Sequence, residues 1–242
     1  MSYAIIGFGS IGQALARAFA RNNIEVTVAS RRPPEALLPQ AQAIGPTVIP
    51  RTLQEAVKAD VIILAVLFEG HHEVARILPD WKGKTIIDAM NTNDPVENLD
   101  GLPSSAFAAK AFPGARFVKG FNHLLARTLA TDPNVEGGHR VVFLSSDDEA
   151  AAARVTDLAK RLGFAPVYLG KFDEGGTLVQ ARGRVWGPLI FQDLFKHEPE
   201  RRPPPRDRNQ LPNQGTANSP PTSSFPTSLK QGYPRFRRGP MT

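Results

Sequence analysis

The sequence predicts an α/β protein of the Rossmann-like, doubly wound kind, with a mostly parallel sheet and helices on both faces. Two observations predict this fold. Apolar runs of strand length alternate with amphipathic segments along much of the 242-residue chain, a pattern typical of βα units joined by right-handed crossovers. The first of these runs leads directly into a G-x-G-x-x-G turn, and an amphipathic segment leaves that turn.

The glycine turn predicts a dinucleotide site at the start of the chain. Gly7 allows the tight turn, Gly9 lets the backbone approach a pyrophosphate, and Gly12 lets the helix pack closely on the strand. The free N–H groups and the positive dipole end of that helix then face the phosphates. The alternative is a tight turn in some other α/β protein. The residues predicted to bind the cofactor here are Gly7, Phe8, Gly9, Ser10, Ile11 and Gly12.

The residues at the end of the second predicted strand, which spans 24–30, predict which dinucleotide binds. These residues are Ser30, Arg31 and Arg32. An NAD enzyme usually carries an acid here that accepts from the ribose 2′-hydroxyl. A carboxylate would repel a 2′-phosphate, whereas a hydroxyl and a guanidinium bind one. NADP(H) is therefore the predicted cofactor, and a solvated loop is the alternative interpretation of the two arginines.

The next elements follow in order. The helix after the turn has an apolar face at i, i+4, i+7 and i+8. That face consists of Ile11, Leu15, Ala18 and Phe19. A short strand at 48–49 precedes a helix over 52–58, which Thr52 caps with Glu55 three residues on. The continuous apolar run at 61–66 is typical of a central parallel strand that is covered on both faces.

The second half continues the alternation. A helix is expected over 70–78, a strand over 85–88, a helix from Ser104 or Ser105 to residue 112, and strands over 116–121 and 140–144. Acidic residues at 147–149 begin a long helix that Gly163 ends. A last strand is expected at 166–169. Residues 174–197 are rich in glycine and aromatic side chains and are interpreted as a short helical C-terminal cap or contact element.

Further ligand contacts are expected beyond the carboxyl ends of the strands, where open α/β sheets bind ligands. Val66, Leu67 and Phe68 follow one strand and are predicted to pack against the nicotinamide. Asn91 and Asn122 follow the next two strands and offer amides to a carboxamide or to a second ligand. Capping of the strand ends is the alternative for both asparagines.

No acid–base or metal-binding set is evident in the sequence. The chain has no cysteine, which excludes disulfides and thiolate metal sites. His71 and His72 stand at a predicted helix start, where solvent contact is the favoured interpretation. His123 is the only histidine at the carboxyl end of a strand and is a candidate pocket residue. We therefore predict no catalytic residue and no metal ligand.

The net charge of +6 is concentrated at the C-terminal end. Residues 199–242 carry all of this excess and ten of the 22 prolines. Because this segment has few apolar residues, we predict a disordered basic tail following one domain at residues 1–198. No apolar run is long enough to span a membrane. The expectation is a cytoplasmic protein that binds neither membrane nor nucleic acid.

Four segments, residues 7–12, 30–32, 118–122 and 175–180, resemble the coenzyme F420-dependent NADP oxidoreductase family. That family includes NADPH:deazaflavin reductases, and the reductase domain of the STEAP metalloreductases is similar. The resemblance covers roughly residues 1–198. It implies NADPH on the glycine turn, with Ser30, Arg31 and Arg32 at the 2′-phosphate. It also implies that coenzyme F420 or a flavin such as FMN is the second substrate, in a pocket rimmed by residues after the fourth, fifth and sixth strands.

The predicted function is hydride transfer between NADP(H) and such a small-molecule acceptor. This chemistry needs mainly the positioning of two rings. One alternative is a non-enzymatic NADP(H)-binding sensor or partner-binding module that uses residues 186–195 as its contact surface. Another is an imine reductase related to pyrroline-5-carboxylate reductases, although no helical dimerisation domain is evident. The same aromatic segment leads us to expect a homodimer.

Overall fold

The computed structural model describes residues 1–181 and 192–197, all within one compact unit, Met1–Pro199. The predicted tail, residues 199–242, lies outside the described residues, and so does most of the predicted contact segment at 186–195. None of the described helices has the length and apolar character needed to cross a membrane.

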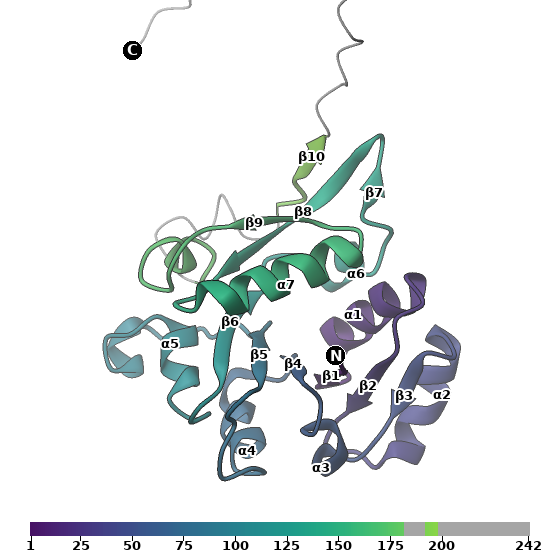
Figure 1. The fold of residues 1–242 in the computed structure, drawn as a ribbon, viewed down its shortest axis with the longest axis horizontal. Coiled ribbons are helices and arrows are strands. Elements are labelled where there is room, and N and C mark those ends of the chain that lie inside the picture. Colours follow the sequence, from purple (N-terminus) through teal and green to yellow (C-terminus); the bar gives the residue numbers. More distant parts are fainter. Residues whose placement is uncertain (182–191, 198–242) are drawn as a thin grey trace, which may run out of the picture. The chain divides into compact units, whose positions relative to one another are not determined.

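Within the described residues, six parallel strands form the body of the sheet in the order β3-β2-β1-β4-β5-β6 (Figure 1). The strand order reverses between β1 and β4, which is the point where doubly wound sheets bind ligands. The predicted Rossmann-like fold is therefore confirmed. The strands are β1 (Tyr3–Ile6), β2 (Val26–Ala29), β3 (Val48–Pro50), β4 (Val61–Leu64), β5 (Thr85–Asp88) and β6 (Arg116–Gly120).

Helices cover both faces of the sheet because successive strand residues point to opposite sides. Ile5 belongs to one apolar cluster and Ile6 to the other. The helices on the side of Ile5 are α1 (Ser10–Arg21), α2 (Pro34–Ile44), α6 (Ala126–Leu129) and α7 (Glu149–Arg161). Those on the side of Ile6 are α3 (Leu53–Ala56), α4 (His71–Ala75) and α5 (Ser104–Ala109).

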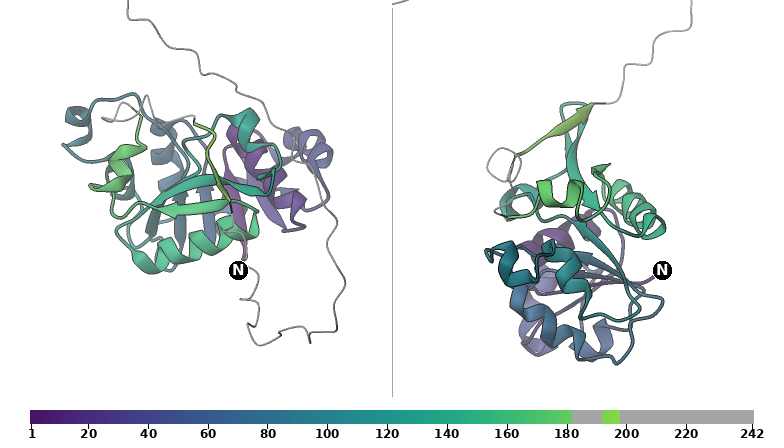
Figure 2. Two further views of the ribbon diagram at one scale, coloured as in Figure 1. Left: turned by 90° about the horizontal axis from the view of Figure 1, so that it is seen from above. Right: turned by 90° about the vertical axis from the view of Figure 1, so that its left-hand side faces the viewer.

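The strands after β6 turn the sheet antiparallel. β8 (Gly138–Ser145) runs antiparallel to β6 and parallel to β9 (Ala165–Tyr168). Its first residues extend past the body of the sheet, where β7 (Asn134–Val135) and β10 (Phe195–His197) flank it (Figures 1 and 2). The predicted helical cap is thus wrong for Phe195–His197, because this segment completes the backbone pairing of an otherwise open strand edge. The described part of the cap also holds the 3₁₀ turn η3 (Gly175–Leu178).

Two helices end earlier than the sequence predicts. The helix predicted over 70–78 is only the short α4, which ends at Ala75 and follows the 3₁₀ turn η1 (Phe68–Gly70). The Trp81 indole N–H donates to the Ala75 carbonyl at 3.1 Å, and Pro79 disfavours helical backbone before it. α5 ends at Ala109 because the following amides bond to carbonyls three residues back. The 3₁₀ turn η2 (Val96–Leu99) precedes α5.

Candidate nucleotide-binding site

The turn after β1 packs its backbone tightly against the end of β4 and the start of α1. Gly7 has a φ of 102°, and a Cβ on it would lie 2.3 Å from the Ala65 carbonyl oxygen. A Cβ on Gly12 would lie 1.8 Å from the Gly7 oxygen. A Cβ on Gly9, in contrast, would meet no described atom within 4 Å. Packing therefore requires Gly7 and Gly12, whereas Gly9 leaves the backbone open to a ligand.

Helix α1 begins at this open point. Gly9 is its N-cap, and no described side chain caps it. The first N–H groups of a helix have no partner within the helix, and they carry the positive end of its dipole. An exposed, uncapped N-terminus of a 12-residue helix is suited to a phosphate group.

The two arginines after β2 lie in different surroundings. The Ser30 hydroxyl accepts from the Arg32 backbone N–H at 3.1 Å, which shapes the turn. Arg31 donates Nε–H to one Glu73 oxygen at 2.9 Å and Nη2–H to the other at 3.2 Å. Arg32 donates instead to the neutral Gln40 amide oxygen at 3.2 Å. One guanidinium thus has an anionic partner and the other a neutral one.

A pocket of about 310 Å³ connects the glycine turn with these arginines. Leu67 forms an exposed part of its wall, with 80% of its surface accessible. Glu73 from α4 and Leu53 from α3 also line the pocket, and sequence reasoning identified neither. The predicted cofactor residues that line it are Gly7, Phe8, Gly9, Ser30, Arg31, Arg32, Val66 and Leu67.

Other predicted residues do not line this pocket. Ser10, Ile11 and Gly12 form the first turn of α1. Phe68 is buried in the apolar cluster beneath η1, with its ring centroid 5.0 Å from that of His71 and 6.2 Å from that of Phe107. Its side chain serves the core in this structure.

Of the three histidines singled out by the sequence, His72 is exposed as expected, whereas His71 and His123 are buried. The expected solvent contact of His71 is wrong, because its ring packs against Phe68 and Phe107 and its Nδ1–H donates to the Phe68 carbonyl. Burial lowers the pKa of His71. Burial also lowers the pKa of His123 to about 4, although the nearby Val141 backbone and Asp193 carboxylate act in the opposite direction. Both rings are therefore neutral near pH 7.

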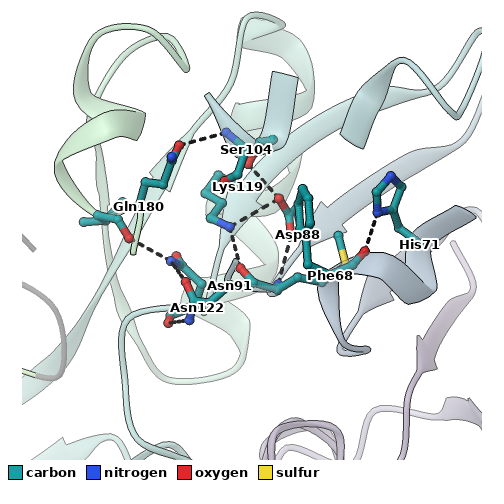
Figure 3. A network of polar contacts seen from close by, with 11 residues as sticks. Phe68, His71, Asp88, Asn91, Ser104, Lys119, Asn122 and Gln180 are labelled. Carbon is teal, nitrogen blue, oxygen red and sulfur yellow. Dashed lines mark hydrogen bonds and ion pairs between the residues drawn. The ribbon is translucent and has the colours of Figure 1, made fainter. Parts of the chain in front are cut away.

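Asn91 and Asn122 form a direct pair at the carboxyl ends of β5 and β6 (Figure 3). The Asn91 amide donates to the Asn122 carbonyl at 2.8 Å, and the Asn122 amide donates to Asn91 Oδ1 at 3.0 Å. Asn122 also donates to the Val179 carbonyl at 2.9 Å, which ties the segment after η3 to this edge. Phe121 has a φ of 60°, an uncommon value for a bulky residue, and it redirects the chain at this point.

A buried ion pair lies next to the asparagines (Figure 3). Lys119 Nζ is 3.3 Å from Asp88 Oδ2, and both side chains are almost fully buried. Lys119 also donates to the Met90 carbonyl at 2.5 Å. Asp88 accepts from the Ser105 hydroxyl at 2.7 Å and from the Met90 N–H at 2.9 Å. The pair thus joins β5, β6, α5 and the segment that leads to Asn91.

Sequence reasoning did not identify this pair as a unit. A signal was present, because Asp88 ends an apolar strand and Lys119 lies within the next one. Charged residues in buried strands need partners. What was missing was the register, which places Asp88 opposite Lys119.

The glycine turn and the residues after β2 lie within the segment that matches a known family. Residues 2–92 match the family model described as NADP oxidoreductase, coenzyme F420-dependent. The chain is also 30% identical over 169 residues to Metalloreductase STEAP3 of Rattus norvegicus, covering 69% of this chain and 33% of that protein. The N-terminal part of the chain, residues 2–92, belongs to the F420-dependent NADP oxidoreductase family.

Solved structures agree with this family fold. The crystal structure of the hypothetical protein SMa0349 from Sinorhizobium meliloti is 37% identical, with a TM-score of 0.75, and covers 81% of this chain and 96% of that one. A structure from Arthrobacter sp. FB24 is 24% identical, with a TM-score of 0.61 and coverage of 78% and 91%. The chain spans about a third of the length of the curated relatives it matches.

Proposed function

We propose that this protein transfers hydride between NADP(H) and a deazaflavin or flavin acceptor. The observation that carries the proposal is a single pocket lined by both the glycine turn and the Ser30–Arg31–Arg32 turn. A pyrophosphate and a 2′-phosphate need different chemistry, and the pocket offers both. Backbone N–H groups serve the first, and guanidinium groups serve the second.

The residues present fit NADP(H) at this pocket. The open face of Gly9 and the uncapped start of α1 would hold the pyrophosphate. Arg31 and Arg32 would hold the 2′-phosphate. Val66 and Leu67 line the same pocket as Arg31, so they favour contact with the adenosine half and not with the nicotinamide. When bound, NADPH supplies the hydride.

The Asn91–Asn122 pair is the candidate site for the nicotinamide end. A dinucleotide bound across the switch point extends from β2 toward the carboxyl ends of the strands beyond β4. Asn91 is exposed there, and the amide of Asn122 fixes its side-chain oxygen. This pair would orient a carboxamide or an acceptor ring, which is the main requirement for hydride transfer between two rings.

The electron count distinguishes a deazaflavin or flavin acceptor from a ferric chelate. A hydride carries two electrons, which a deazaflavin or flavin ring accepts in one step. A ferric chelate accepts one electron, so it would need a carrier between it and NADPH. The family description names coenzyme F420, and the curated relative is a metalloreductase. Both acceptor types therefore belong in the test, and coenzyme F420 and FMN are the acceptors that we expect to work directly.

The first test compares Arg31→Ala with Arg17→Ala. Arg17 is an exposed arginine of α1 that does not line the pocket, so its removal changes the net charge equally. Hydrogen bonds to charged groups contribute about 1.5–3 kcal/mol. Arg31→Ala should therefore weaken NADPH binding about ten- to hundredfold and leave NADH binding nearly unchanged.

The measurement is calorimetric titration of each variant with both dinucleotides, followed by nicotinamide absorbance with coenzyme F420, FMN and a ferric chelate. Arg17→Ala should behave like the wild type. Equal losses for NADPH and NADH in Arg31→Ala would refute the 2′-phosphate role. Tight NADPH binding without turnover on any acceptor would favour the non-enzymatic alternative.

A further inference from the structure

We propose that Glu73 is a specificity-determining residue that competes with the 2′-phosphate of NADP(H) for Arg31. The inference rests on the proposed function and concerns the same pocket. It assigns to Glu73 the role of an internal anion, which holds the guanidinium when no phosphate is present. Glu73 thereby lowers the affinity for NADP(H) and reduces the factor by which the protein prefers NADP(H) to NAD(H).

The geometry of the pair carries the proposal. Both oxygens of Glu73 accept from Arg31, at 2.9 and 3.2 Å, and both residues line the pocket. This two-point contact is the arrangement by which arginine also binds a phosphate group. The carboxylate therefore uses donors that a 2′-phosphate would need.

Glu73 lies at a different place in the chain from the acid that NAD enzymes usually carry. In NAD enzymes, the acid follows the second strand and accepts from the ribose 2′-hydroxyl. In this protein the second strand is followed by Ser30 and two arginines, and the acid comes from α4, 42 residues after Arg31. Arg32 bonds to the neutral Gln40, so no carboxylate of the described residues offsets its charge at the pocket. A phosphate would thus meet two arginines and one opposing carboxylate.

Because the pair is exposed, a phosphate can replace the Glu73 carboxylate on Arg31. The side chains of Arg31 and Glu73 are 73% and 58% accessible, so neither is locked by packing. Exposed ion pairs contribute at most about 1 kcal/mol, and a phosphate can displace the carboxylate at modest cost. NADP(H) must break the pair or share the guanidinium with a like charge. NAD(H) carries no 2′-phosphate and can bind with the pair intact.

The test is Glu73→Gln, with Glu69→Gln as the matched control. Glu69 lies in η1, is exposed, and does not line the pocket, so its replacement removes the same charge nearby without freeing Arg31. Dissociation constants for NADP⁺ and NAD⁺ are measured by calorimetry at low ionic strength on the full chain. We expect Glu73→Gln to tighten NADP⁺ binding about three- to fivefold, as the loss of an exposed pair allows, and to leave NAD⁺ within twofold.

The same substitution in the Arg31→Ala background separates competition for Arg31 from general repulsion. Competition predicts that most of the gain disappears when Arg31 is absent. An unchanged ratio of NADP⁺ to NAD⁺ affinity in Glu73→Gln, or an equal change in Glu69→Gln, overturns the inference while the proposed function stands. A wild-type protein that binds neither dinucleotide overturns the proposed function itself.

Discussion

Two ion pairs, one at the strand-order reversal and one beyond it, show how burial decides the role of a charge. Arg31 follows β2, Glu73 belongs to α4, and both are more than half exposed. Asp88 and Lys119 lie in β5 and β6 and are almost fully buried. The exposed acid accepts only from its arginine among the described residues, whereas the buried acid accepts from three groups.

This difference indicates that the two pairs serve different purposes. Water can solvate Arg31 and Glu73 separately, so a ligand can replace one partner. Separating Asp88 from Lys119 would leave a charge without solvent and would disturb the segments that lead to Asn91 and Asn122. The first pair is suited to binding and the second to holding the carboxyl edge of the sheet in one arrangement. Three measurements of stability test this distinction.

The largest effect is expected from Lys119→Met. Removing one partner of a buried ion pair usually lowers the free energy of unfolding by about 3–5 kcal/mol, because Asp88 stays buried without its cation. The control is Lys110→Met, which removes the exposed pair with Asp100 and should change stability by less than about 1 kcal/mol. Urea unfolding followed by circular dichroism measures both. Equal losses in the two variants would mean that burial does not distinguish these pairs.

A pH titration of stability tests how burial acts on a single titratable ring, that of His123. Neither ring nitrogen of His123 makes a hydrogen bond within the described residues, and its pKa is lowered to about 4. The unfolded chain, with a pKa near 6.5, binds more protons between these two values. Stability should therefore be full above pH 6.5 and should fall by about 3 kcal/mol as the pH drops to 4.

The controls for this titration are His123→Gln and His139→Gln. The glutamine at 123 does not titrate, so the slope between pH 4 and 6.5 should become shallower, and the slope that remains includes the contribution of His71, whose pKa burial also lowers. His139 is partly accessible, and its replacement should leave the slope in place. A slope that is unchanged in His123→Gln would assign the pH dependence to other groups.

The smallest effect is expected for the stability of Glu73→Gln. The exposed pair should contribute less than about 1 kcal/mol to the free energy of unfolding. The difference from the wild type should disappear near 1 M salt, where charges are screened over about 3 Å. Urea unfolding at two salt concentrations measures this. A loss comparable to that of Lys119→Met would show that the Arg31–Glu73 pair is structural and not exchangeable.

Local features of the chain were predictable to different degrees. The Thr52–Glu55 capping box is confirmed in both of its hydrogen bonds, and the strand at 85–88 has the predicted bounds. α7 begins after Asp148, whose side chain accepts from the Ala151 N–H as the acidic segment suggested. The strand at 195–197 was missed, because three residues with no clear alternation form a strand only when a partner edge is available.

The candidate site also combines features that the sequence predicts with features that it does not. The sequence alone determined the βα alternation, the glycine turn and the arginines after β2, because each depends on residues a few positions apart. Only the tertiary structure decided that Glu73 meets Arg31, that Asp88 meets Lys119, and that Asn91 pairs with Asn122. These partners lie 31 or 42 residues apart in the chain. Strand register and helix placement bring them together, and those follow from burying one shared core.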